Sequence, residues 1–332
     1  MRFFATTLLT TLAILSGVTA FNYHIDPMCF YNCNTIDVTK PTMNTYYNVA
    51  QKIVKHPESQ LVMLGSSRGQ TTPLKWIEKH TGLKTLNLSL GGAELEAKLI
   101  FLNIALEKLK IKRVLWFADF FELSPEILDS KIKNTPVLRS YLEGEQKRPF
   151  FSIVSDTLKS LIDHNTFEAS LFILHRGTTS QLDQGSGSDL DPDRCDSAAY
   201  KGEKSYEAME KEVGFSFEVY ARKVLKMKQT PDSWIIFLRK LEELSQRGID
   251  VSIVITPYNP EFIERMKAEE PKTYAAQLQW ISRLKKLQIP NVRVINFFDG
   301  IPGDDKTQRF WNDGVHFTCK GSIEMLKQVF PD

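Results

Sequence analysis

The sequence lacks an excess of charge of either sign. Its 332 residues include 42 lysines and arginines and 40 aspartates and glutamates, which leaves a formal net charge of +2. A protein that binds nucleic acid usually carries a clear positive excess. The composition therefore gives no support for nucleic acid as a partner. With 42% hydrophobic and 25% charged residues, it is otherwise that of an ordinary globular protein.

Cysteine is scarce, and its spacing does not predict a metal centre. The chain has four cysteines: Cys29, Cys33, Cys195 and Cys319. A single Cys-x-x-x-Cys pair without further ligands is poor evidence for zinc. In an exported chain the even count permits disulfides, with Cys29–Cys33 and Cys195–Cys319 as candidate pairs and free thiols as the alternative. We expect no metal and no cofactor.

An aspartate-containing loop within the Gly/Ser/Asp-rich piece Gly177–Gly202 resembles a calcium site only in part. The EF-hand pattern requires a glycine where this sequence has Arg194, and a bidentate glutamate where it has Tyr200. The loop is better read as flexible and solvated.

One long apolar run is present at the start of the chain. Phe3–Asn22 contains no charged side chain, and only Arg2 precedes it. Residues 1–22 therefore fit either a signal peptide or a membrane-spanning anchor. The small residues Val18-Thr19-Ala20 favour cleavage, whereas four threonines make the run only modestly apolar. In both cases residues 23–332 are predicted to be exported.

Short apolar runs alternate with helical patterns on both sides of an irregular middle section. Strands are predicted at Leu61–Leu64, Lys84–Leu90, Arg113–Ala118, Val251–Thr256 and Val292–Phe297. Helices are predicted at Tyr47–Lys55, Leu74–His80, Ala93–Lys110, Asp232–Arg247, Glu261–Leu287 with a break near Pro271, and Ser322–Val329. This alternation predicts a parallel sheet covered on both faces. Residues at about 120–230 lack it and are predicted to form a large, mostly helical insertion, with helices at Ser152–Asp163 and Glu207–Glu212.

Two serines follow the first predicted strand directly. Leu61–Leu64 ends at Gly65, and Ser66 and Ser67 come next. In an open α/β sheet, ligands bind just beyond the carboxyl ends of the strands. A serine in this position is nevertheless more often a turn residue or a helix N-cap. The pair is therefore informative only together with a second motif.

That second motif lies in the predicted loop Phe310–Thr318. Asp313 and His316 are three residues apart, so the carboxylate can hold one imidazole nitrogen and leave the other as a general base. Of the six histidines, only His316 has such a neighbour in the sequence.

Together these residues resemble the SGNH, or GDSL-like, hydrolase superfamily. Ser67 stands at the nucleophile position of block I, Gly91 within Asn87–Gly92 at the oxyanion position of block II, and Asp313 and His316 in block V. The resemblance implies a three-layer α/β/α flavodoxin-like (SGNH) fold, with backbone N–H groups of Ser67 and Gly91 facing the oxyanion.

Block III departs from the family pattern. The family places an asparagine side chain after the third strand, whereas this chain has Phe117-Ala118-Asp119. Loss of one oxyanion donor typically costs roughly 10²–10³ in rate, so activity is not excluded.

A branch of exported or membrane-anchored bacterial proteins, some linked to acylation of cell-surface polysaccharides, is more similar still. The matching segments are Gly65–Arg68, Asp119–Phe121 and the Asn-Tyr-x-x-Asp-Pro motif at Asn22–Pro27. Because that motif adjoins the apolar run, the resemblance favours an uncleaved anchor in the inner membrane. The remainder would be periplasmic or otherwise extracytoplasmic.

Gly65–Gly69 also fits the Gly-x-Ser-x-Gly elbow of α/β-hydrolases. That fold has several strands before the serine and places its acid on a separate strand, well before the histidine. Here the serine follows the first strand and Asp313 immediately precedes His316, which favours the SGNH-like interpretation.

Two classes of function follow. In the first, a serine-dependent esterase or O-acyltransferase acts on an acylated cell-envelope glycan or similar ester: Ser67 attacks, His316 takes its proton and Asp313 holds the ring. In the second, a catalytically silent envelope protein binds glycan or partner proteins through the same pocket. The change in block III and the insertion favour the second class, and the intact triad favours the first.

Four further residues have two interpretations each. Arg68 could bind a substrate carboxylate or phosphate, or form a structural ion pair. Asp119 could line the substrate pocket or cap the next segment. Tyr258 and Trp311 could form a sugar-stacking wall or pack in the interior.

Overall fold

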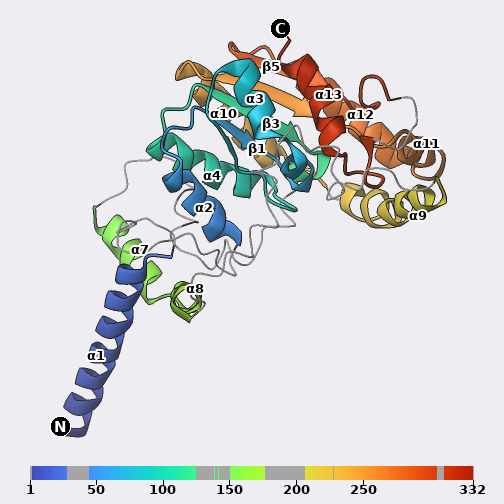
Figure 1. Cartoon of the computed structure of the whole chain (residues 1–332). Coiled ribbons are helices and arrows are strands. Elements are labelled where there is room, and N and C mark those ends of the chain that lie inside the picture. The colour runs from blue at the N-terminus through green and yellow to red at the C-terminus, as the bar shows by residue number, and fades with distance from the viewer. Residues whose placement is uncertain are drawn as a thin grey trace. The chain divides into compact units, whose positions relative to one another are not determined.

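The computed structural model describes residues 2–27, 45–124, 138, 141, 150–175, 206–226, 228–304 and 310–331 (Figure 1). The chain separates into two compact units. The first comprises Met1–Pro57, Leu99–Lys108 and Leu128–Gly185, and the second comprises Glu58–Lys98, Leu109–Ile127 and Ser186–Asp332. The boundaries predicted for the anchor, the α/β domain and the insertion stay predictions.

The second unit is built on a five-stranded sheet. Its strands are β1 (Leu61–Leu64), β2 (Thr85–Asn87), β3 (Arg113–Ala118), β4 (Asp250–Ile255) and β5 (Val292–Asn296). The order is β2-β1-β3-β4-β5, and every neighbouring pair is parallel. The predicted parallel sheet is therefore confirmed. The bounds of β1 and β3 are those predicted, while β2, β4 and β5 differ at their ends.

The central strands β1, β3 and β4 are mostly apolar because both faces of the sheet are covered. All four residues of β1 are buried, as are the last five of both β3 and β4. Parallel sheets require such cover, since each crossover places a helix on one face. β5, at the edge, is only partly buried.

Helices lie on both sides of this sheet (Figure 1). They are α3 (Leu74–Thr81), α9 (Tyr206–Ser216), α10 (Pro231–Gln246), α11 (Pro260–Glu269), α12 (Pro271–Lys285) and α13 (Cys319–Val329). With right-handed crossovers, this strand order places α3 on one face and α10 and α12 on the other. The predicted three-layer, flavodoxin-like α/β/α arrangement is confirmed.

Local signals account for several helix boundaries. The Thr230 hydroxyl accepts a hydrogen bond from the Ser233 N–H at 3.2 Å, and Pro231 begins α10. Gly82 ends α3 with φ of 67°, a conformation that glycine adopts without strain. Pro271 separates α11 from α12, as the sequence predicted, because proline cannot continue a helix.

A buried ion pair links α4 (Leu95–Lys108) to the 3₁₀ turn η2 (Phe120–Leu123) that follows β3. The Lys98 ammonium contacts the Glu122 carboxylate and also donates to the Phe117 carbonyl at 2.7 Å. The Trp116 indole donates to the same carboxylate at 3.3 Å. Burial raises the pKa of Glu122, whereas Lys98 lowers it, and burial prevails.

In the first unit, α1 (Arg2–Ile25) packs at its C-terminal end against α7 (Phe150–Ile162) and α8 (His164–His175). The Asn22 side chain donates to the Leu161 carbonyl at 2.7 Å, and the rings of Phe21 and Phe167 meet edge to face at 5.6 Å. The remaining turns of α1 expose their apolar side chains. The helix contains an 18-residue window with a mean hydropathy of 1.7 and is long and apolar enough to cross a membrane. It could serve as a signal peptide or an anchor.

Parts of the predicted insertion form helices. The helix predicted at Ser152–Asp163 is α7, and the one predicted at Glu207–Glu212 lies within α9, whereas α8 was not predicted. The acidic piece at 177–202 lies outside the described residues, as do Cys29, Cys33 and Cys195. Cys319 is disulfide-bonded, and the predicted pairing stays a prediction.

Candidate active site

Ser67 opens the 3₁₀ turn η1 (Ser67–Thr71), which follows β1 at the carboxyl edge of the sheet. The neighbouring Ser66 serves as the N-cap, because its hydroxyl accepts a hydrogen bond from the Arg68 N–H at 3.4 Å. Ser66 is buried and Ser67 is partly exposed. Ser66 therefore caps the turn, and Ser67 is the more accessible of the two serines.

Close backbone packing fixes η1 beside β2. The Asn87 side chain donates to the Gly69 carbonyl at 2.9 Å and accepts from the Ser89 N–H at 2.9 Å. A Cβ atom on Gly69 would collide with the Ser89 hydroxyl, and one on Gly65 would lie 2.8 Å from it. Glycines at these two positions allow the turn to approach β2.

His316 is held by a short, internally bonded loop before α13. Trp311 and Phe317 form an isolated antiparallel bridge that closes the loop. One oxygen of Asp313 accepts from the N–H groups of Val315 and His316 at 2.7 and 2.8 Å. The other lies 2.7 Å from Nδ1 of His316. Burial disfavours the charged carboxylate, but these hydrogen bonds outweigh it and lower the pKa of Asp313.

The serine and the histidine meet although 249 positions separate them. The distance from Ser67 Oγ to His316 Nε2 is 2.8 Å. Thr71, at the end of η1, donates to the Phe317 carbonyl at 3.2 Å and accepts from the Ser322 hydroxyl at 3.4 Å. The structure thus brings together a hydroxyl, an imidazole and a carboxylate in the order that nucleophilic catalysis requires.

This cluster is open to solvent. The side chains of His316 and Asp313 are 26% and 22% exposed, respectively. Ser67 is also partly exposed, so all three side chains are accessible to solvent.

Arg68 and Asp119 form an enclosed ion pair beneath the triad. Arg68 Nε lies 3.3 Å from Asp119 Oδ1, and the two side chains are 1% and 0% exposed. Thr256 bridges them, accepting from Arg68 at 2.6 Å and donating to Asp119 at 3.0 Å. Burial lowers the pKa of Arg68, but Tyr258 and Asp119 outweigh it and raise the pKa. Of the two interpretations of Arg68, the structural ion pair is the one observed, and neither charged group reaches solvent.

The remaining predicted residues differ in their surroundings. Gly91 is exposed after β2, and its proposed N–H donation to an oxyanion stays a prediction. Trp311 and Tyr258 are each 2% exposed. Trp311 donates to Asp304 at 2.7 Å, and Tyr258 stacks on Phe262 with 5.2 Å between ring centroids. Both aromatics pack in the interior, so they do not form a sugar-stacking wall.

Tyr220, which no sequence motif marks, also lies at the site. It belongs to the π-helical turn η7 (Phe217–Ala221) that directly extends α9. Its ring meets the His316 ring edge to face at 6.0 Å, and the side chain lies near enough to Ser67 to interact with it. No motif marked this tyrosine, because it lies in the predicted insertion and approaches Ser67 only through tertiary packing.

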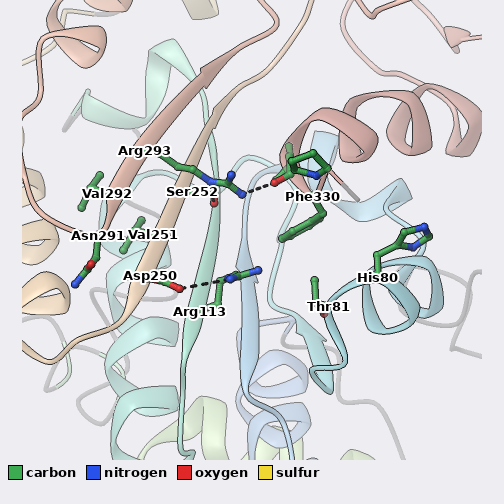
Figure 2. A pocket seen from close by; sticks show the side chains of 12 residues that line it. His80, Thr81, Arg113, Asp250, Val251, Ser252, Asn291, Val292, Arg293 and Phe330 are labelled. Atoms are coloured by element: carbon green, nitrogen blue, oxygen red, sulfur yellow. Dashed lines mark hydrogen bonds and ion pairs between the residues drawn. The ribbon is translucent and has the colours of Figure 1, made fainter.

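A separate cavity of about 500 Å³ lies at the opposite edge of the sheet, where β3, β4 and β5 begin (Figure 2). Arg113 pairs there with Asp250 at 3.4 Å, and Arg293 donates to the Ser252 hydroxyl at 2.8 Å. Burial and the charge of Arg113 lower the pKa of Arg293. Parallel α/β sheets carry out chemistry at the carboxyl edge, so this cavity is distinct from the candidate active site.

Across the ranges that the structure describes, no group of three or more histidine, cysteine, aspartate or glutamate side chains could hold a metal ion.

Comparisons with known proteins add little to this geometry. No protein-family model matches the chain, and no curated protein matches it. Among solved structures, the chain is similar to a Streptococcus pneumonia protein provisionally named a platelet activating factor. The identity is 9% and the TM-score 0.38, over 98% of this chain and 96% of that one. A similarity at this level supports no conclusion about function.

Proposed function

We propose that the protein is a serine-dependent esterase or O-acyltransferase of the SGNH type, with Ser67, His316 and Asp313 as its catalytic triad. The observation that carries this proposal is the continuous contact from Ser67 Oγ to His316 Nε2, at 2.8 Å, and from His316 Nδ1 to Asp313, at 2.7 Å. Both contacts are within hydrogen-bonding range, and the cluster is open to solvent.

In the proposed acylation step, Ser67 Oγ forms a bond to the acyl carbonyl carbon and its proton passes to His316 Nε2. The carbonyl π electrons move onto oxygen, where backbone N–H groups of Ser67 and Gly91 stabilise the developing charge. When the intermediate collapses, the carbonyl re-forms, the ester C–O bond breaks, and His316 returns the proton to the leaving alcohol.

Asp313 stabilises the imidazolium that forms during this step. Its lowered pKa keeps the carboxylate ionised at neutral pH, so a negative charge adjoins the ring whenever His316 is protonated. The hydrogen bond to Nδ1 also fixes the ring orientation and directs Nε2 at Ser67.

The second half of the reaction determines the product. Water attacking the acyl-serine gives hydrolysis, and a sugar hydroxyl gives acyl transfer. An apolar N-terminal helix of membrane-spanning length supports a place in the cell envelope. We infer that the substrate is an acylated envelope glycan or a similar ester and that α1 anchors the protein to the membrane.

One observation favours a second candidate, a catalytically silent protein that binds a glycan or an envelope protein. The residue that follows β3 is Asp119, and its enclosed carboxylate cannot donate a hydrogen bond to an oxyanion. In this alternative the same cluster would bind a ligand without attacking it.

The test is hydrolysis of p-nitrophenyl acetate by the purified full chain. We expect Ser67→Ala to lower kcat at least 10³-fold, because the nucleophile is absent. Ser66→Ala is the matched control: it removes a buried cap and costs about 0.5–2 kcal/mol of stability, but leaves kcat within a few-fold. Equal rates for folded wild type and Ser67→Ala would favour the silent binding protein.

A further inference from the structure

The residue after β3 does not supply a side-chain hydrogen-bond donor to the proposed oxyanion hole. Asp119, at the carboxyl end of β3, offers only acceptor oxygens when ionised and is enclosed against Arg68 at 3.3 Å. The backbone N–H groups of Ser67 and Gly91 would then face the oxyanion without help from a side chain. A third donor would have to come from another element that reaches Ser67.

The π-helical turn η7 is such an element, because it packs against the loop that carries His316. Ser216, the residue before this turn, accepts a hydrogen bond from the Gly314 N–H at 3.3 Å. A Cβ atom on Gly314 would lie 2.8 Å from the Phe262 ring and 2.9 Å from Ser216. This close packing fixes η7 against the loop that carries Asp313 and His316. Single π turns inside helices occur frequently at functional sites, because they redirect one side chain.

The side chain that η7 directs to the triad is Tyr220. Its ring lies at 81° to the His316 ring with 6.0 Å between centroids, and the side chain lies near enough to Ser67 to interact with it. The side chain is only partly buried, so it is accessible to a ligand bound at Ser67.

We propose that Tyr220 is a further catalytic residue, whose phenolic O–H donates a hydrogen bond to the carbonyl oxygen of the ester as Ser67 attacks. The inference rests on the proposed function. The proton stays on Tyr220 throughout, while the electron pair of the C=O bond moves onto the oxygen that accepts this hydrogen bond. When the carbonyl re-forms, the hydrogen bond weakens and Tyr220 is unchanged.

The electrostatic surroundings fit a donor in this position. Burial raises the pKa of Tyr220, so the hydroxyl keeps its proton at neutral pH. Arg68 lies near enough to interact with Tyr220, and its guanidinium pairs with Asp119, donates to Thr256 and lies over the Tyr258 ring.

A purely structural role for Tyr220 makes a different prediction. If the ring only holds His316 in place, removal of the hydroxyl should leave the reaction unaffected, because phenylalanine keeps the edge-to-face contact. A defect in ring packing would also slow every substrate equally. If Tyr220 instead donates to the carbonyl oxygen, the loss of rate in Tyr220→Phe should be larger for a substrate whose carbonyl atom is a better hydrogen-bond acceptor.

The test compares p-nitrophenyl acetate with its thionoester, in which sulfur replaces the carbonyl oxygen and accepts hydrogen bonds poorly. We expect Tyr220→Phe to lower kcat on the oxygen ester roughly 10²-fold with little change in KM, the loss typical of one oxyanion donor. The loss on the thionoester should be several-fold at most. Tyr274→Phe, on α12 and 6.0 Å from the Phe298 ring, is the matched control and should change neither rate.

Equal losses on the two esters, or no loss in folded Tyr220→Phe, would overturn the assignment and leave the proposed function intact. Turnover that does not depend on Ser67 would overturn both. The geometry predicts that the ratio of kcat on the oxygen ester to kcat on the thionoester is at least ten-fold smaller in Tyr220→Phe than in wild type. Turnover of both esters should still depend on Ser67.

Discussion

Asp313 accepts more hydrogen bonds than any other residue of the triad. Two come from backbone N–H groups within its own loop and one from the His316 ring. The backbone bonds fix the carboxylate before any substrate arrives, so the third bond can set the tautomer of the imidazole. In the proposed mechanism, Asp313 therefore acts through its hydrogen bond to His316.

We predict that Asp313→Asn lowers kcat about 10⁴-fold while KM changes little, because an amide donates where a carboxylate accepts and so favours the wrong imidazole tautomer. Steady-state kinetics with p-nitrophenyl acetate would measure the loss. Asp232→Asn, on the exposed start of α10, should retain wild-type activity. Retention of more than a tenth of wild-type kcat by Asp313→Asn would contradict the role assigned to this residue.

The lowered pKa of Asp313 also predicts a pH dependence of stability. A carboxyl whose pKa is lower in the folded than in the unfolded state stabilises the fold above its unfolded pKa, about 3.9. That contribution disappears as the pH falls through the folded pKa. The free energies of unfolding of wild type and Asp313→Asn should therefore converge below about pH 4, as measured by urea titration. A difference that stays constant from neutral to acidic pH would argue against it.

The residues of the site differ in how far the sequence could predict them. Ser67 follows a buried strand, and Asp313 and His316 lie three apart, so local spacing was enough to propose all three. The partner of Arg68 could not be chosen from the sequence, because it depends on β3 lying beside β1. Tyr220 could not be predicted at all, since a π turn in an irregular section carries no recognisable pattern.

At the level of elements, the buried pair between Lys98 of α4 and Glu122 of η2 connects two segments of the second unit. Removal of one partner leaves an uncompensated charge in the interior, which typically costs 3–5 kcal/mol. Replacement of both partners by uncharged residues costs much less, because no isolated charge remains.

We therefore predict that Lys98→Met lowers the free energy of unfolding by about 3–5 kcal/mol, and that adding Glu122→Gln recovers part of that loss. Glutamine keeps an acceptor for the Trp116 indole. Urea denaturation of the two single variants and the double variant would give the coupling energy. Strictly additive losses would show that the two side chains are not coupled.

The accuracy of the predicted elements follows from their burial. β1 and β3 were predicted at their observed bounds, because strands covered on both faces read as unbroken apolar runs. The predicted Lys84–Leu90 strand is shorter in the structure, where β2 ends at Asn87. Leu88 and Leu90 still donate to the carbonyls of Met63 and Gly65, at 2.9 and 3.0 Å, but outside regular strand geometry. α8 was missed because its apolar residues follow no clear face.

At the scale of the whole molecule, α1 is either retained as a membrane anchor or removed as a signal peptide. The helix continues past the possible cleavage point at Ala20 to Ile25, and the Asn22 side chain in its last turns is bonded to α7. The apolar side chains of its earlier turns are exposed to solvent, as expected of a segment that lies in lipid.

We predict that the full chain stays in the membrane fraction after a high-salt wash and that its mature N-terminus lies before Phe21. Leu12→Arg places a charge at the middle of the helix, at a cost of roughly 2.5–3.5 kcal/mol, and should reduce insertion. Leu12→Val should behave as wild type. A soluble mature protein that begins at Phe21, as identified by mass spectrometry, would show that the segment is a cleaved signal peptide.

The central claim is that folding brings the Ser67 hydroxyl and the His316 imidazole into contact and so makes this serine a nucleophile. The most direct measurement is reaction of the folded protein with a fluorophosphonate, followed by intact-mass analysis and peptide mapping. The account predicts one adduct per chain, on Ser67, which is lost in Ser67→Ala and His316→Ala and retained in Ser66→Ala. No adduct on folded wild-type protein, or an adduct on another residue, would contradict it.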